Sequence, residues 1–510
     1  MHRRNFLQSV VGMGAASVGW PGARLLAGPS GSASYFGLHA FIEAHPEAVF
    51  IRKTNVASKD DAEGKKNAAL DLAKRIFTQR NTPGLDLTHK FTLKPNLTTS
   101  EDSAARFAMV TDPNVIEGLI GGIEQAGVEG ENIYVREGNQ VIAYPGTRYH
   151  RMAQRTGVHY DDTDSRTPTT KECPAGVVFR RTKYMGPFNY PDSHLINVSK
   201  MKAHTMGLTL CVKNLQGTNA RPYIHFCEGM QYAITQDFQP DALRHVEDLY
   251  AKHRQAGFPR WKTPQGGWME MWAQRTLDSY SLVRSSILLN MVEGVDAQNG
   301  DGFSGGPGPN GEPEIFMTNM LIFGKDAFRV DIIGHWLGGH EPGNFGLFHL
   351  AKERGVSNAL NPHNIPVYRW EDSGPKLTPL EQFTRTPLTT LYLAKPGEPP
   401  FHLCNEPFTY PAEPLSACLS GHERPTLRVL GQARMGKEGG TLFVEYSLPA
   451  EGDAALEVYD GFGERVGVLA EGRLRRGVHL AEWRTQGRAA GLYCCRLKAH
   501  GATLAEAAWV

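Results

Sequence analysis

The sequence has few cysteines, and none of them are spaced like the ligands of a metal cluster. Seven cysteines occur in 510 residues, and no two of them form a Cys-x-x-Cys pair. Iron–sulfur clusters and zinc ribbons are usually held by cysteines at such short spacings. The sequence therefore contains no iron–sulfur cluster motif.

The chain also lacks an excess of either charge and lacks long apolar segments. Lysine and arginine total 54 against 53 aspartate and glutamate residues, a formal net charge of +1. A strongly basic chain would indicate a nucleic-acid or anionic membrane partner, so we expect neither. Beyond the N-terminal leader, no segment has the roughly 20 apolar residues that a membrane helix needs. We expect no integral membrane span once that leader is removed.

The N-terminus carries a pattern typical of export signals. Residues 2–8 read HRRNFLQ, close to a twin-arginine motif, and a Gly/Ala/Val-rich stretch follows to about Gly19. Small residues near Ala27 or Ala33 are suitable cleavage sites. The pattern predicts an export signal over residues 1–33, and a location in the bacterial periplasm or on the cell surface. Because this route carries folded proteins, often with a cofactor already installed, it also hints at a cofactor.

Strands and helices alternate over most of the chain. The apolar patterns predict strands at 90–93, 132–135, 195–198, 286–291 and 320–323, with helices at 61–80, 115–126 and 327–337. Such alternation is typical of an α/β fold with a layered, largely parallel sheet flanked by helices. We assign residues 34–400 to this domain, and residues 401–424 to a linker.

The last part of the chain has a different pattern. Residues 425–510 contain short alternating segments separated by Gly, Asp and Pro, which predict a small all-β sandwich. Its sequence, including VEYSLPAEGDAALEVYDGFGERVGVL and AGLYCCRL, resembles the immunoglobulin-like domain that ends flagellar hook-capping and surface-sorted bacterial proteins. The resemblance implies attachment, assembly or sorting through an envelope or surface partner, and supplies no catalytic group.

A basic stretch follows the predicted strand at 195–198. Lys200, Lys202 and His204 fall within five residues, and Lys213 stands beside Asn214. Side chains of like charge held together at one strand end repel one another unless a negative group lies among them. The stretch therefore predicts a site for an anion, such as a carboxylate, a phosphate or a charged cofactor.

Other predicted strands also end in polar residues. Lys94 and Asn96 follow one strand, Glu137 a second and Glu293 a third. Because the carboxyl ends of parallel strands meet at one edge of a sheet, we expect these side chains to surround one ligand. The alternative is that each is a solvated loop residue. The predicted ligand-binding set is Lys94, Asn96, Glu137, Lys200, Lys202, Asn214 and Glu293, with His204 and Lys213 as catalytic candidates.

Histidines elsewhere are weaker candidates for a metal. His225, near Cys227 and Glu228, is the candidate metal ligand. His335 and His340 are five residues apart and do not share a helical face, so we interpret them as ordinary packed or solvated residues. A metal or an anionic cofactor is compatible with the pattern, and its identity stays open.

Several short motifs together resemble a known family. They are Lys94-Pro95-Asn96, Thr111-Asp112-Pro113, Glu137-Gly138, the block 200–217, Glu293-Gly294 and Asp326-Ala327. In order and spacing, residues from about 91 to 368 resemble the domain of unknown function 362 family. The resemblance implies an α/β domain of unestablished activity, sometimes accompanied by ferredoxin-type cysteine clusters that this chain lacks.

A second, more distant similarity is to the nickel-pincer lactate racemase family, in the order His204, Lys213, His225. In that family a lysine holds the cofactor covalently, and histidines ligate nickel or move protons. The spacings here differ from that pattern.

Three hypotheses follow from these patterns. The first is an exported envelope protein that binds a small anionic ligand or cofactor, with His204 and a lysine of lowered pKa performing acid–base chemistry on it. The second is a non-catalytic anion-binding, metal-binding or scaffold protein of the envelope. The third is a racemase-like enzyme of the nickel-pincer type. The sequence does not decide whether the protein is an enzyme.

Overall fold

The computed structural model describes the chain from Ser34 onward, with gaps. The described residues are 34–98, 108–138, 146–160, 168–204, 207–220, 223, 236–258, 266–301, 305–390, 401, 406–410, 426–434, 440–460, 464–485, 487–488 and 492–509. The predicted export signal at 1–33 and the candidate metal ligand His225 lie outside them, as does most of the predicted linker at 401–424.

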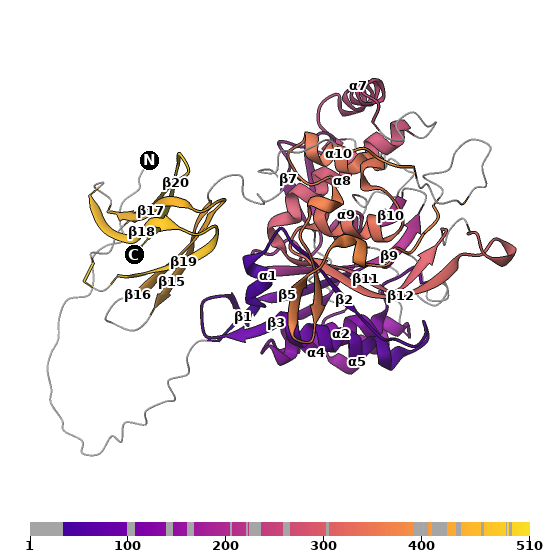
Figure 1. The fold of residues 1–510 in the computed structure, drawn as a ribbon, viewed down its shortest axis with the longest axis horizontal. Coiled ribbons are helices and arrows are strands. Elements are labelled where there is room, and N and C mark those ends of the chain that lie inside the picture. Colours follow the sequence, from indigo (N-terminus) through magenta and orange to yellow (C-terminus); the bar gives the residue numbers. More distant parts are fainter. Residues whose placement is uncertain are drawn as a thin grey trace, which may run out of the picture. The chain divides into compact units, whose positions relative to one another are not determined.

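A nine-stranded mixed sheet forms the centre of the α/β domain (Figure 1). Its strands are, in spatial order, β14 (Gly374–Leu377), β13 (Val367–Glu371), β2 (Val49–Lys53), β12 (Glu314–Gly324), β11 (Ile287–Asn299), β9 (Ser193–His204), β5 (Lys90–Pro95) and β6 (Ile133–Val135), with β10 (Gly207–Thr209) paired to the end of β9. The four neighbours β11, β9, β5 and β6 are parallel, whereas β12 runs antiparallel to both β11 and β2.

Helices cover both faces of this sheet. One apolar core lies under α2 (Ala62–Ile76), α4 (Pro113–Gln125) and α5 (Arg148–Thr156). The other lies under α6 (Cys211–Asn214), α8 (Gly266–Val283), α9 (Ala327–Leu337) and α10 (Gly346–Glu353). Figure 1 shows α2, α4 and α5 on one side of the strands and α8, α9 and α10 on the other. We call these the α4 face and the α6 face.

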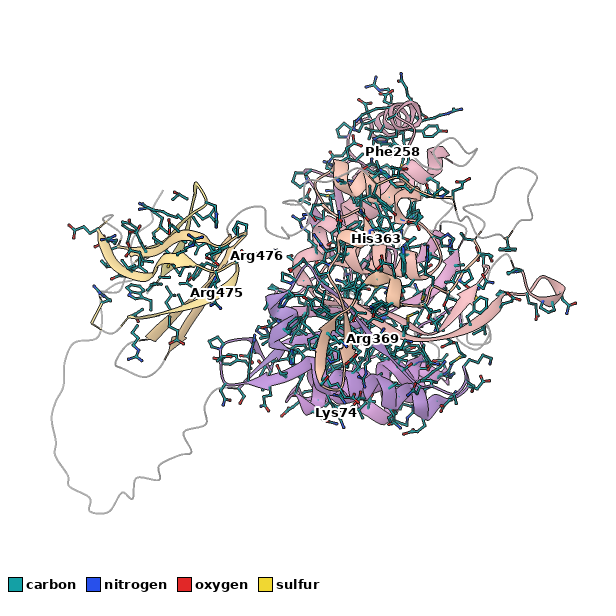
Figure 2. The ribbon with its side chains drawn as sticks, in the orientation of Figure 1. Lys74, Phe258, His363, Arg369, Arg475 and Arg476 are labelled. Atoms are coloured by element: carbon teal, nitrogen blue, oxygen red, sulfur yellow. The ribbon has the colours of Figure 1, made fainter. Side chains whose placement is uncertain are left out.

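Smaller elements complete the domain. They are α1 (Ala40–Ala44), α7 (Ala242–Gln255), a sheet of β1 (Tyr35–Leu38), β3 (Phe77–Arg80) and β4 (Leu85–Asp86), and the pair β7 (Thr169–Glu172) and β8 (Arg181–Tyr184). Side chains fill the space between the sheet and its helices, while Lys74 in the last turn of α2 is exposed (Figure 2).

The predicted α/β class is confirmed, but several strands are longer than the sequence predicted. The expected strand at 195–198 extends to His204 in β9, and the one at 286–291 extends to Asn299 in β11. Lys200, Lys202 and His204 therefore lie within a strand and not in a loop after it. A buried strand tolerates Lys200 because Glu293 of the adjacent strand pairs with it.

Capping explains where two predicted helices begin. The Asp112 side chain accepts a hydrogen bond from the Asn114 N–H, and Pro113 occupies the first turn of α4. Asp326 caps α9 in the same way. Asp331, which lies inside α9, accepts the N–H groups of Cys211 and Val212 and so caps α6 across the core.

The C-terminal residues form two antiparallel sheets, as the alternating pattern predicted. One contains β15 (Thr426–Arg434), β16 (Gly440–Leu448) and β19 (Gly477–Arg484). The other contains β18 (Arg465–Leu474), β17 (Gly452–Tyr459), β20 (Leu492–Ala499) and β21 (Ala502–Trp509). Alternate side chains such as Leu442, Val444 and Leu456 enclose a separate apolar core. None of the described helices combines the length and apolarity needed to cross a bilayer.

Candidate functional site

The carboxyl ends of β5, β6, β9 and β11 meet at one edge of the sheet because these four strands are parallel. Side chains alternate between the faces of each strand. Ile196 and Val198 of β9 pack into the core of the α4 face, whereas Met201 and Ala203 belong to the α6 face. The predicted site residues are therefore brought to one edge but divided between two faces.

Lys94 is the centre of the group on the α6 face. It is 1% exposed, and its Nζ lies 2.5 Å from Glu137 Oε2 and donates to Asn214 Oδ1 at 2.9 Å. Asn96 donates to the same Asn214 oxygen at 3.1 Å. Four of the predicted residues, Lys94, Asn96, Glu137 and Asn214, thus form one buried hydrogen-bonded group.

The electrostatics of this pair reflect its burial. Burial lowers the pKa of Lys94 and Lys213 lowers it further, while the Glu137 carboxylate opposes both. Burial likewise raises the pKa of Glu137, against the effects of Lys94 and of the N–H groups of Leu97 and Gly138. Those two N–H groups donate to the carboxylate at 3.1 and 2.9 Å.

A glycine makes room for the carboxylate. A Cβ on Gly217 would lie 1.8 Å from Glu137 Oε1 and 2.7 Å from Lys94 Nζ. Both distances are too short for any side chain, so the Lys94–Glu137 ion pair can form in this geometry only with glycine at position 217. The carbonyl of Gly217 also accepts the N–H of Gly138 at 2.7 Å.

Lys213, in the last turn of α6, stands beside this group. Its side chain is 9% exposed, and in the part of the chain that the structure describes it makes no hydrogen bond and no ion pair. Its charge lowers the pKa of Lys94 and also that of His204, so its ammonium lies near both.

His204 and Lys202 are buried at the end of β9. Burial holds the pKa of His204 well below its usual value, and the charges of Lys213 and Lys202 lower it further, so the imidazole is neutral at pH 7. Lys202 donates to the Met109 carbonyl at 2.7 Å and to Thr98 Oγ1 at 3.2 Å. The charges of Lys202 and Lys213 thus both act on the His204 imidazole.

Lys200 and Glu293 belong to a different group, on the α4 face. Lys200 Nζ lies 2.6 Å from Glu293 Oε2 and 3.2 Å from Asp296 Oδ1. Asp296 also pairs with Lys65 of α2 at 2.9 Å, and Lys65 pairs with Asp112 at 3.0 Å. All five side chains are less than 10% exposed. We call Lys65, Asp112, Lys200, Glu293 and Asp296 the α4-face network.

A comparison with family models matches the part of the chain that contains most of these residues. Residues 92–335 match the model described as Domain of unknown function (DUF362). This segment is a DUF362 domain. No curated protein matches the sequence.

The DUF362 segment begins in β5 and ends in α9, so it contains every described residue of the predicted site. Lys65 lies before it, in α2, and sequence reasoning missed it. The sequence gives little indication that Lys65 belongs to a site, because a lysine on an amphipathic helix is ordinarily a surface residue. Asp296 was missed because the predicted strand ended before it.

The described residues of the DUF362 domain contain no cluster of three or more His, Cys, Asp or Glu side chains arranged to hold a metal ion. His335 is buried against Phe345 and Phe348, and its Nδ1 bonds to the Asp331 carbonyl at 2.9 Å. His340 is buried as well, and its Nε2 bonds to the Leu388 carbonyl at 2.6 Å. These histidines are packed within the fold, as the sequence analysis interpreted them.

Proposed function

We propose that the DUF362 domain binds a small anion, a carboxylate or a phosphate, in the space bounded by Lys94, Lys202, His204 and Lys213. The observation that carries the proposal is that the largely buried Lys213 lacks a hydrogen-bond or ion-pair partner among the described residues. An anion beside an ammonium on a largely buried side chain is screened less by water than one beside an exposed lysine. Lys94, its neighbour, has Glu137 and Asn214 as partners, whereas Lys213 has none among the described residues. A bound anion supplies the missing partner.

The neutral imidazole of His204 gives this site a proton acceptor. A base poised beside a bound acid is what general base catalysis needs. A bound anion would also offset the charges of Lys213 and Lys202, which both lower the pKa of His204. Anion binding and protonation of His204 are therefore linked, and each favours the other.

This linkage gives a direct test of the proposed site. We expect phosphate or a small dicarboxylate such as malonate to bind more tightly as the pH falls, with uptake of up to one proton per anion. The reason is that His204 has a lowered pKa in the free protein and a higher one in the complex. Calorimetric titrations in two buffers of different ionisation enthalpy measure the uptake, and His204→Gln should remove it while binding persists.

Two outcomes would contradict the proposal. One is the absence of any binding heat at millimolar anion between pH 5 and 8. The other is equal binding by the wild type and by Lys213→Met, with Lys74→Met as the control that removes one exposed lysine elsewhere on the domain.

We also propose that the protein acts in the bacterial cell envelope. Two features support this proposal: the motif at residues 2–8 and the β-sandwich at the C-terminal end. Changing both Arg3 and Arg4 to lysine should block export through the twin-arginine route and leave the protein in the cytoplasm. Cell fractionation with immunoblotting measures this. An unchanged periplasmic or surface fraction in the variant would reject that route.

A further inference from the structure

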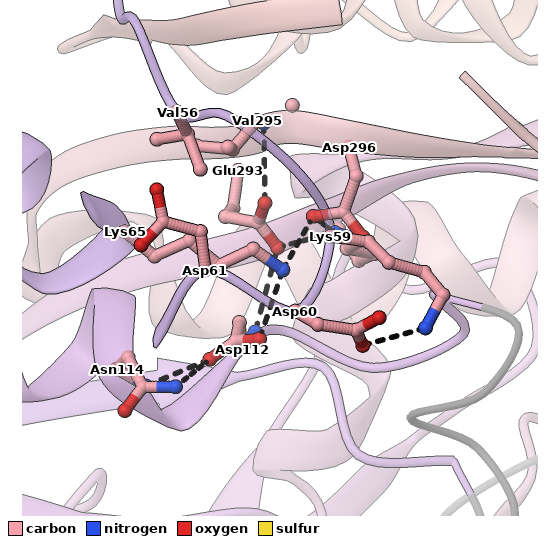
Figure 3. Close-up of polar contacts among 12 residues, drawn as sticks. Val56, Lys59, Asp60, Asp61, Lys65, Asp112, Asn114, Glu293, Val295 and Asp296 are labelled. Carbon is pink, nitrogen blue, oxygen red and sulfur yellow. Dashed lines mark hydrogen bonds and ion pairs between the residues drawn. The ribbon is translucent and has the colours of Figure 1, made fainter. Parts of the chain in front are cut away.

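A separate cavity lies on the α4 face of the sheet. It has a volume of about 480 Å³, within the range of small-molecule sites of roughly 300–1,000 Å³. Its floor is formed by part of the α4-face network, and its lining also includes Lys59, Asp60, Asn114 and Arg148. Figure 3 shows the polar contacts of Lys65, Asp112 and Asp296 in this region. The beginnings of α2, α4 and α5 all border it.

The two buried lysines of the floor have hydrogen-bonding capacity to spare. Each ammonium carries three N–H donors. Lys65 pairs with Asp112 and Asp296, and Lys200 pairs with Glu293 and Asp296, which uses two donors on each. Both side chains line the cavity and are at most 2% exposed. One donor on each lysine is therefore left for an acceptor within the cavity.

A hydrogen-bond acceptor also lies in the floor of the cavity. Asp296 Oδ1 pairs with the ammonium groups of both Lys65 and Lys200, whereas Asp296 Oδ2 makes no hydrogen bond to any residue that the structure describes. Asp112 differs, because Lys65, Arg148 and Asn114 occupy both of its oxygens. The floor thus offers two donors and one carboxylate oxygen to the same guest.

The balance of charge restricts what the guest can be. The lining contains four basic side chains (Lys59, Lys65, Arg148 and Lys200) and three acidic ones (Asp60, Asp112 and Asp296), with Glu293 buried behind them. A simple anion would meet the carboxylates, and a simple cation would meet the lysines and the helix N-termini. Among the described residues, the apolar lining is limited to Ala62, Ala108 and Val110, which give a hydrophobic guest little to contact.

We infer that this cavity is a second ligand site, which takes a small zwitterion of amino-acid type. The carboxylate of the guest accepts the spare N–H donors of Lys65 and Lys200, and its ammonium donates to Asp296 Oδ2. The site differs from the proposed anion site in the residues that form it, because Lys94, Lys202, His204 and Lys213 are not among the described residues that line this cavity.

Matched probes test this assignment. The twenty amino acids are screened by thermal shift and calorimetry at up to 10 mM, and the tightest is compared with its analogues lacking the ammonium or the carboxylate. For alanine these are propionate and ethylamine. We expect the amino acid to bind at least about tenfold more tightly than either analogue. Binding of no amino acid, or equal binding of the deaminated acid, overturns the inference.

A variant at the cavity wall separates this site from the anion site. Ala62 is the first residue of α2 and is exposed, so Ala62→Trp fills the cavity without touching the α4-face network. We expect amino-acid affinity to fall at least about tenfold while phosphate binding is unchanged. Glu63→Trp adds the same bulk one residue later, where the side chain does not line the cavity, and should bind like the wild type. Amino-acid binding that survives in Ala62→Trp places the ligand elsewhere.

Discussion

Replacing Lys94 with methionine is expected to lower the free energy of unfolding by about 3–5 kcal/mol, the usual effect of breaking one side of a buried ion pair. Glu137 is 6% exposed and would keep only the N–H groups of Leu97 and Gly138 as partners. The loss arises from the carboxylate that is left behind, and less from the attraction that is removed.

The pH dependence of this effect follows from the remaining carboxyl. Without Lys94, the N–H groups of Leu97 and Gly138 alone oppose the effect of burial on Glu137, so its pKa in the folded state rises further above the value in the unfolded chain. Below the unfolded pKa both states hold the proton, and the penalty is absent. As the pH rises through that value and toward the folded one, the unfolded state loses its proton first, and the variant loses stability. Urea denaturation at pH 4 and pH 8 should show the larger deficit at pH 8.

Two controls make the Lys94 result interpretable. The double variant Lys94→Met/Glu137→Gln removes both charges and should recover most of the lost stability. Lys90→Met removes a lysine from the same strand whose partner, Asp192, is 38% exposed, so its effect should stay within about 1 kcal/mol. If Lys94→Met were as mild as Lys90→Met, the ion pair would not be formed in solution.

Much of the α/β framework could be predicted from local sequence. The pattern Thr111-Asp112-Pro113 located the start of α4, because a capping side chain and a proline in the first turn act locally. Apolar periodicity located β5 and β9, and their parallel pairing then brought Lys94 to the edge that contains Lys202. The predicted meeting of strand ends thus needed only short-range signals and one rule about parallel sheets.

The division of the site between two faces could not be predicted in that way. It depends on where β9 ends, and charged residues at 200 and 202 indicated an end at 198. The strand continues because Glu293 and Asp296, more than 90 residues away, neutralise Lys200. Lys65 is placed in the same network by the packing of α2 against α4, again through contacts distant in sequence.

Lys213→Met is expected to raise the free energy of unfolding, whereas Lys94→Met lowers it. In the absence of anions, it replaces a largely buried lysine, whose ammonium has no partner among the described residues, with an apolar side chain of similar length. We expect the variant to be more stable than the wild type by about 1–3 kcal/mol, the scale of an uncompensated buried polar group. A residue that destabilises its own fold in this way indicates a functional site rather than a structural one.

Added phosphate should reverse that order. A ligand that binds only the folded protein stabilises it by RT ln(1 + [L]/Kd), which reaches about 2.7 kcal/mol at one hundred times Kd. The wild type should gain this stability and Lys213→Met should not, so that their denaturation midpoints approach or cross as phosphate is raised. Lys74→Met, which removes an exposed lysine of α2, should follow the wild type throughout. Should Lys213→Met prove less stable without anions, or gain as much from phosphate as the wild type does, Lys213 would have a partner within the protein and the anion site would lose its basis.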